Sequence, residues 1–271
     1  TYSHAHTLSI SGGSENVRYY TSLGYSAENG NLKREENNRY SGMAKVDVNH
    51  KKFLMSFSLN GSVQKKQYTP QEVGLMTYAL NTARSVGAYN EDGSLMFYQR
   101  DDDLEHTYSK PFSIINEREN TDDNIQTNAI NVSTNIEYRL IPCLKAGVQF
   151  SYGISNFEER VYFGEKSWYA ANLRKEYAPG TDNFGYTAAD SEMPVGGELR
   201  LNNTKNENYS VRANLSFNKF LDKESRHQFQ ASVIGELSST LYTSFAITKR
   251  GYIPERGMLF DDVNLPDSWG Y

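Results

Sequence analysis

The side chains that could carry acid–base chemistry or bind a metal are scattered along this chain of 271 residues. The histidines are His4, His6, His50, His106 and His227, and the one cysteine is Cys143. We interpret His4 and His6 as surface residues rather than metal ligands, because they lie close to one end of the chain. A single cysteine provides neither a disulfide within the chain nor a thiolate metal site.

Known catalytic and cofactor-binding motifs are absent from the sequence. There is no Gly-x-Ser-x-Gly nucleophile elbow, no phosphate-binding loop and no dinucleotide fingerprint. An acidic run, Asp101, Asp102, Asp103 and Glu105, could bind calcium, but it lacks the spaced oxygen ligands and the glycine of a calcium-binding loop. We therefore favour a solvated acidic loop here, and we expect no enzymatic activity, no cofactor and no metal site.

Recognition by aromatic side chains is the chemistry that the sequence favours. A long polar stretch, residues 158–206, contains Trp168, Tyr169, Tyr177 and Tyr186. Aromatic side chains are enriched where proteins contact partners. We predict that these four side chains contact a substrate or a partner protein. The alternative is that they pack this loop onto the rest of the molecule.

The elements that must position these residues are β-strands. From Thr7 to Tyr25, small polar and larger apolar residues alternate on both sides of a turn at residues 12–16. Side chains alternate between the two faces of a strand, so this stretch predicts a hairpin with one apolar and one polar face. The same alternation recurs along the chain and predicts eight strands, at residues 8–11, 17–26, 41–48, 53–63, 130–140, 144–155, 209–218 and 228–237.

The order of the connections indicates how these strands are arranged. Short turns at residues 12–16, 49–52, 141–143 and 222–226 alternate with longer connections at residues 27–38, 65–125, 158–206 and from residue 239 onward. In an up-and-down barrel this order places all turns at one rim and all loops at the other, as in outer-membrane barrels. We also predict one loop helix, residues 70–84, with Thr69 as its N-cap and Glu72 completing a capping box. We expect its apolar stripe to pack on neighbouring loops.

Composition limits the other possibilities. The net charge of −5 argues against nucleic acid as a partner. The apolar runs are too short for a transmembrane helix, whereas a strand of about 10 residues crosses a bilayer when tilted. Two other classes stay open. One is a soluble carbohydrate-binding β-sandwich, which would bury the apolar faces against each other, and the other is a surface adhesin or passive porin.

Two stretches of the sequence are also familiar. Residues 6–33, HTLSISGGSENVRYYTSLGYSAENGNLK, and residues 115–140, INERENTDDNIQTNAINVSTNIEYRL, resemble the SusC/RagA family of TonB-linked outer-membrane transporters. The resemblance implies that the chain is all-β, an arc of about eight antiparallel up-and-down strands from a 22-stranded outer-membrane barrel in contact with lipid. It implies that residues 1–271 are part of a TonB-dependent transporter barrel domain, without the plug domain and the C-terminal strands.

The resemblance also implies the partners. They would be a SusD-like surface lipoprotein that forms a lid, TonB acting through the plug, and an oligosaccharide or peptide substrate. The aromatic loop residues named above would then contact the substrate or the lid.

Overall fold

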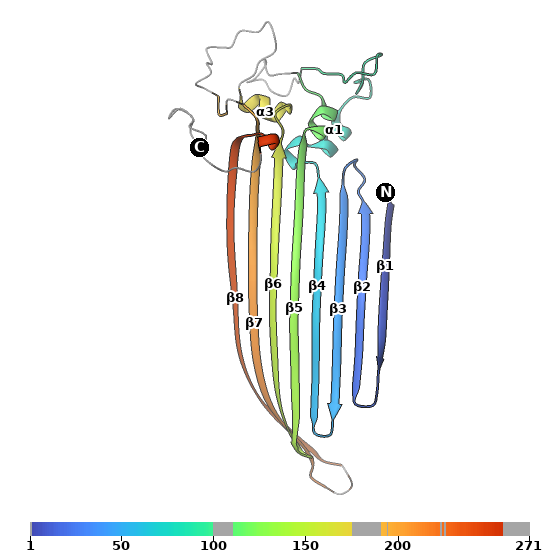
Figure 1. Cartoon of the computed structure of the whole chain (residues 1–271), viewed down its shortest axis with the longest axis vertical. Coiled ribbons are helices and arrows are strands. Elements are labelled where there is room, and N and C mark those ends of the chain that lie inside the picture. Colours follow the sequence, from blue (N-terminus) through green and yellow to red (C-terminus); the bar gives the residue numbers. More distant parts are fainter. Residues whose placement is uncertain are drawn as a thin grey trace.

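The computed structural model describes residues 2–99, 111–174, 191–193, 195–222, 224 and 226–256. One antiparallel sheet of eight strands, in the order β1 to β8 along the chain, forms this part of the protein (Figure 1). The strands are β1 (Tyr2–Gly13), β2 (Val17–Asn29), β3 (Glu36–His50), β4 (Phe53–Tyr68), β5 (Thr121–Ile141), β6 (Leu144–Phe163), β7 (Gly197–Phe220) and β8 (Gln228–Tyr252). The helices are η1 (Gln71–Val73), α1 (Leu75–Asn81), α2 (Ile114–Glu119), α3 (Trp168–Leu173) and η3 (Pro254–Arg256).

The predicted alternation of connections is confirmed. The β1–β2, β3–β4, β5–β6 and β7–β8 turns lie at one end of the sheet, and the longer connections lie at the other end with the helices (Figure 1). No second sheet packs on this one among the described residues, so the sandwich alternative is not supported. The described part of the chain also contains no helix that is long and apolar enough to span a membrane.

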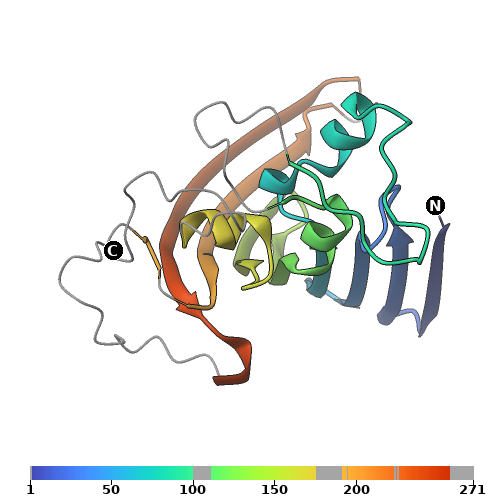
Figure 2. The ribbon, with the colours of Figure 1, turned by 90° about the horizontal axis from the view of Figure 1, so that it is seen from above.

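The strand register gives the sheet one face of apolar side chains and one face of polar side chains. On one face Leu59 lies opposite Val132, which lies opposite Tyr152. On the other face a row of serines crosses five strands in register: Ser58, Ser133, Ser151, Ser210 and Ser238. The sheet is curved, and helices α1, α2 and α3 lie over its concave side (Figure 2). Tyr169 of α3 bonds Glu198, which is an even number of residues from Ser210 on β7 and therefore shares its face. The concave side is thus polar and the convex side apolar.

The strands extend well beyond their apolar segments. On β5 the convex face is apolar over residues 130–140, and we take this as the membrane-spanning segment, since about 10 residues are needed. Above it, residues 121–129 continue the strand with polar side chains on both faces. The predicted loop from residue 239 onward is wrong in its first part, because β8 continues to Tyr252. Pairing with β7 gives hydrogen-bond partners to the backbone N–H and C=O groups of this extension.

The helix predicted at residues 70–84 is also wrong in its bounds. Gly74 adopts a left-handed backbone conformation, with φ of 65°, and separates η1 from α1. No side chain caps η1 at its N-terminus, and Glu72 bonds Arg200 instead of completing a capping box. The expected packing of the apolar stripe is wrong for Met76 and Leu80, which are 49% and 76% exposed.

Two further short helices were not predicted, α2 and α3. Each has six residues. Such a segment is too short to show a helical repeat of apolar residues, and its stability comes from side chains elsewhere in the fold.

Candidate functional site

Helix α3 carries two of the four predicted recognition residues, Trp168 and Tyr169, and is fixed at its N-terminus by two side chains. The hydroxyl of Ser167 accepts a hydrogen bond from the backbone N–H of Ala170 at 3.1 Å. The carboxylate of Glu117, from α2, accepts a hydrogen bond from the backbone N–H of Trp168 at 2.6 Å. Both interactions satisfy amides that a helix leaves without an internal partner. Because Glu117 is only 2% exposed, this contact joins α2 to α3 in a buried position.

Tyr169 attaches α3 to the concave face of the sheet. Its ring stacks on Phe163 at the end of β6, with centroids 3.9 Å apart. Its hydroxyl donates to the carboxylate of Glu198 at 3.1 Å and accepts from Nη2 of Arg200 at 2.5 Å. Burial, followed by the nearby charge of Glu198, raises the pKa of the Tyr169 phenol above its ordinary value, although Arg200 acts in the opposite direction.

Glu198 is the buried charge of this site, at 1% exposed. Its two oxygens are bound by Arg200, from Nε at 2.7 Å, and by Arg250 of β8, from Nε at 3.2 Å. A buried carboxylate is stable only when it is paired and hydrogen-bonded in this way. Arg200 also forms an ion pair with Glu72 of η1, and Arg250 forms one with Glu192 at 2.8 Å. Two arginines of the sheet, Arg200 and Arg250, therefore hold the β4–β5 connection and the β6–β7 connection.

A second group of aromatic side chains joins the loop segments to each other. Phe112, which is 2% exposed, lies between three rings. Its ring centroid lies 5.8 Å from that of Trp168, which it meets edge-on, and 5.9 Å from those of Tyr78 and Tyr98. The hydroxyl of Tyr98 donates to that of Tyr78 at 2.7 Å. These contacts connect α1, the segment before α2, and α3 into one layer over the concave side of the sheet.

The structure thus brings two of the predicted residues together and leaves the other two outside the described residues. Trp168 and Tyr169 are adjacent and partly exposed, whereas Tyr177 and Tyr186 fall in the range 175–190. The acidic run at residues 101–105 also lies outside the described residues. Within the described ranges, no group of three or more His, Cys, Asp or Glu side chains is placed to hold a metal ion.

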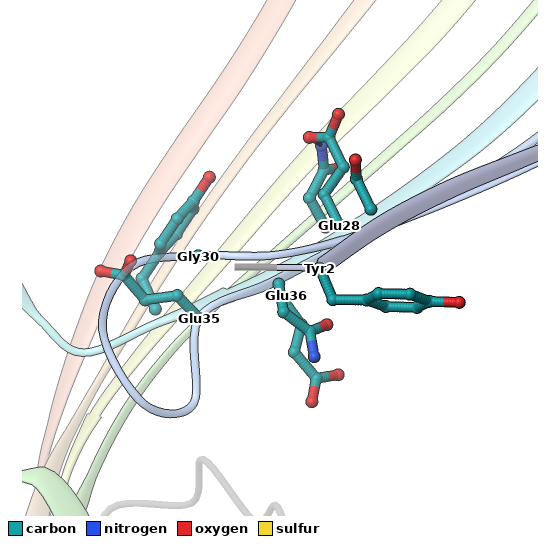
Figure 3. Close-up of a pocket in the computed structure, with 9 residues that line it drawn as sticks. Tyr2, Glu28, Gly30, Glu35 and Glu36 are labelled. Carbon is teal, nitrogen blue, oxygen red and sulfur yellow. Dashed lines mark hydrogen bonds between the residues drawn. The ribbon is translucent and has the colours of Figure 1, made fainter.

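A hollow at the loop end of β2 and β3 is lined by three carboxylates, those of Glu28, Glu35 and Glu36. Figure 3 shows these side chains pointing in different directions. The carboxylate of Glu28 accepts a hydrogen bond from Asn37, and that of Glu35 accepts one from the N–H of Leu32. Because the carboxylates do not converge, this hollow is not a candidate binding site.

Five further residues of this site were not predicted from the sequence: Glu117, Phe163, Glu198, Arg200 and Arg250. A partial signal was present, since Glu198 and Arg200 are two residues apart and therefore share a face of a strand. Their partners come from segments far away in the sequence, and no local pattern indicates such contacts.

Comparison with known proteins shows which sequences and structures this chain is similar to. No protein-family model matches the chain. TonB-dependent receptor P26 of Formosa agariphila is 38% identical over 90 residues, which is 32% of this chain and 9% of that protein. TonB-dependent receptor P3 of the same organism is 28% identical over 120 residues, 41% of this chain and 12% of that protein.

Solved structures match nearly the whole chain. The RagAB peptide importer in its closed-closed state matches with a TM-score of 0.71 and 16% identity, over 98% of this chain and 27% of the solved chain. The open-open state of the same importer matches with a TM-score of 0.72, over the same fractions of this chain and of the solved chain. The fold of the chain is SusC/RagA-like. The chain spans about a quarter of the length of the solved chains that it matches.

The SusC/RagA-like assignment explains the two faces of the sheet. In outer-membrane barrels the outward side chains are apolar and the inward ones are polar. The convex face of this chain is therefore the lipid side, the concave face is the luminal side, and the location is the bacterial outer membrane. Helices α1, α2 and α3 lie at the loop end of the sheet (Figure 1) and over its luminal side (Figure 2). Glu198 lies at the same end, because it is the second residue of β7.

Proposed function

We propose that this chain forms part of the barrel wall of a TonB-dependent transporter that imports oligomeric nutrients, glycans or peptides, across the outer membrane. The observation that carries the proposal is the division of one curved sheet into a lipid face and a luminal face of hydroxyl and carboxamide groups. The Oγ atoms of Ser58 and Ser133 lie 2.7 Å apart, as do those of Ser151 and Ser210. The names of the two TonB-dependent receptors and of the RagAB peptide importer support the same function.

The proposed partners are a SusD-like lipoprotein at the loop end and TonB, which supplies the energy for uptake. The loop layer supports a lid at this position, because Met76 and Leu80, one turn apart on α1, are exposed apolar side chains at the loop end. Exposed apolar residues that lie close together commonly mark contact sites for proteins. We assign the contact with substrate or lid to Trp168, Tyr169, Tyr177 and Tyr186, as predicted from the sequence.

Deletion of the gene in its own bacterium tests the transport function. Uptake of fluorescently labelled glycan and peptide pools is measured in the wild type, in the deletion strain and in a strain without TonB. We expect uptake of one pool to be lost in both mutant strains. Uptake that persists without TonB would contradict the proposal and would favour a passive pore. Unchanged uptake of both pools after deletion of the gene itself would favour an adhesin.

Alanine substitutions test the contact residues within the same protein. Trp168→Ala and Tyr169→Ala should weaken co-purification of the lipoprotein or raise the substrate concentration needed for half-maximal uptake. Phe220→Ala is the matched control, because it is an exposed aromatic residue at the opposite end of the sheet. If lid association and uptake are unchanged in both loop variants, these residues only pack the loop.

A further inference from the structure

His4 and His6 occupy neighbouring positions on the same face of β1. They are two residues apart in an extended strand, so both side chains leave the sheet on one side. Leu8 and Ile10 continue that side, which makes it the convex, lipid-side face. His6 lies opposite Tyr25, one row beyond the pair formed by Leu8 and Leu23. Both imidazoles therefore lie at the edge of the apolar band, with His6 exposed and His4 half-buried.

The spacing of the two rings fits a shared metal ion. Their centroids are 5.3 Å apart, with 60° between the ring planes. Imidazole nitrogens bind zinc at about 2.0–2.1 Å in tetrahedral geometry, which places the centroids of two coordinated rings about 5.2 Å apart. Two ring nitrogens on neighbouring residues of a rigid strand lose little freedom when they bind one ion.

The surroundings of His4 favour a metal ligand over a hydrogen-bonded surface residue. Its ring packs against the rings of Tyr2, with centroids 5.3 Å apart, and of Tyr25, edge-on with centroids 5.6 Å apart. Its Nδ1 atom is buried and has no hydrogen-bond partner among the described residues. The convex face of β1 and β2 carries no lysine or arginine, because Arg18 lies in register with the opposite face. A divalent cation would therefore meet no positive side chain on these two strands.

We propose that His4 and His6 form a two-imidazole chelate for a divalent transition-metal ion at the outer edge of the membrane, with water completing the coordination. Imidazole suits zinc, copper and nickel, and Cu²⁺ binds most strongly to a given set of nitrogen ligands. This proposal revises the interpretation of both histidines as plain surface residues. It is independent of the transport function, since neither residue lies on the luminal face.

Copper binding to the complete protein, purified in detergent as its gene encodes it, tests the proposal. Electron paramagnetic resonance of the Cu²⁺-loaded protein should show coupling to two nitrogens. His4→Gln and His6→Gln should each weaken Cu²⁺ binding, measured by titration calorimetry, about tenfold or more and leave coupling to one nitrogen at most. His227→Gln, in the β7–β8 turn, is the matched control and should bind as the wild type does.

Moving one histidine to the other face separates chelation from a general effect of histidine content. The double substitution of His4→Ala with Ala5→His keeps the number of histidines but places the two rings on opposite faces. We expect it to abolish the two-nitrogen signal. Wild-type protein without that signal would overturn the proposal, even if no variant could be purified. Equal binding by the wild type and the double variant would overturn it as well.

Discussion

Arg200 donates a hydrogen bond from Nη2 to the hydroxyl of Tyr169 at 2.5 Å, and this contact joins strand β7 to helix α3. The same guanidinium binds the buried carboxylate of Glu198 and the carboxylate of Glu72. One wall residue therefore holds segments from two long connections, the one between β4 and β5 and the one between β6 and β7. We expect the position of the loop layer over the lumen to depend on this residue.

Arg200→Ala should release both segments from the wall. Of its two arginines Glu198 would keep only Arg250, together with the hydrogen bond from the Tyr169 hydroxyl. The hydrogen bonds lost from charged groups are worth about 1.5–3 kcal/mol each. We expect faster amide hydrogen exchange in η1 and α3, measured by mass spectrometry on the protein in detergent. Arg212→Ala is the control, because Arg212 forms an exposed pair with Glu236 at 2.7 Å. Unchanged exchange in α3 would show that Tyr169 and Phe163 suffice to hold it.

The luminal carboxyl of Asp123 should make the loop attachment depend on pH. It lies above the membrane-spanning segment of β5, and burial, followed by the charges of Glu159, Glu72 and Asp122, raises its pKa from 3.8 to about 6. Between about pH 4 and 6 the folded state binds more protons than an opened one, so the free energy of opening falls as pH rises through this window and then stays constant. Ionised Asp123 also repels Glu72 of η1.

We therefore expect η1 to be more protected from hydrogen exchange at pH 5 than at pH 7.5, after correction for the intrinsic exchange rate. Asp123→Asn should remove that difference. Asp92→Asn should leave it intact, because Asp92 is exposed and its hydrogen bonds with Ser94 lower the pKa of that carboxyl. The same pH difference in the Asp123→Asn protein would show that another group causes it.

Gly197 at the start of β7 should tolerate no side chain. A Cβ atom there would lie 2.0 Å from the backbone oxygen of Phe163. Gly197→Ala should cost about 1–3 kcal/mol, as other substitutions that overfill a packed site do. The measurement is urea unfolding of the protein refolded into lipid vesicles. Gly235→Ala is the matched control in β8, since nothing lies within 4 Å of its added Cβ, and it should be neutral or slightly stabilising.

Two neighbouring residues of β5 test which face meets lipid. Ile136 is on the convex face near the middle of the apolar band, and Asn135 is on the concave face. Ile136→Arg should cost about 2–4 kcal/mol of folding free energy in a bilayer, whereas Asn135→Arg should cost much less. Urea unfolding in vesicles compares them directly. Equal costs for the two variants would contradict the assignment of the faces.

Much of the sheet could be predicted from the sequence, because alternation along a strand reports directly on its two faces. Residues 130–140 and 144–155 follow this rule and were placed correctly within β5 and β6. The upper parts of the strands were missed, since residues 121–129 carry polar side chains on both faces and Ile125 lies on the concave face, so the two faces show no clear contrast. In β8 the alternation of apolar and polar residues resumes after Ser-Ser-Thr, with Leu241, Phe245 and Ile247 on the convex face. This alternation therefore does indicate a longer strand.

The candidate site could be predicted only in part. Trp168 and Tyr169 stood out as aromatic residues in a polar loop, and the structure does bring them to the loop end of the lumen. Tyr169 uses its ring and its hydroxyl to contact the wall, and no property of its own segment indicates this. Its partners Phe163, Glu198 and Arg200 come from the ends of two strands.

The sequence by itself determined the number and order of the strands and which side chains share a face, because these properties depend on local alternation and on the lengths of turns. Only the tertiary structure decided that Glu198 would be buried between two arginines and that His4 and His6 would lie beside Tyr25. Those contacts depend on register and curvature, which bring together residues whose separation along the chain carries no periodic signal.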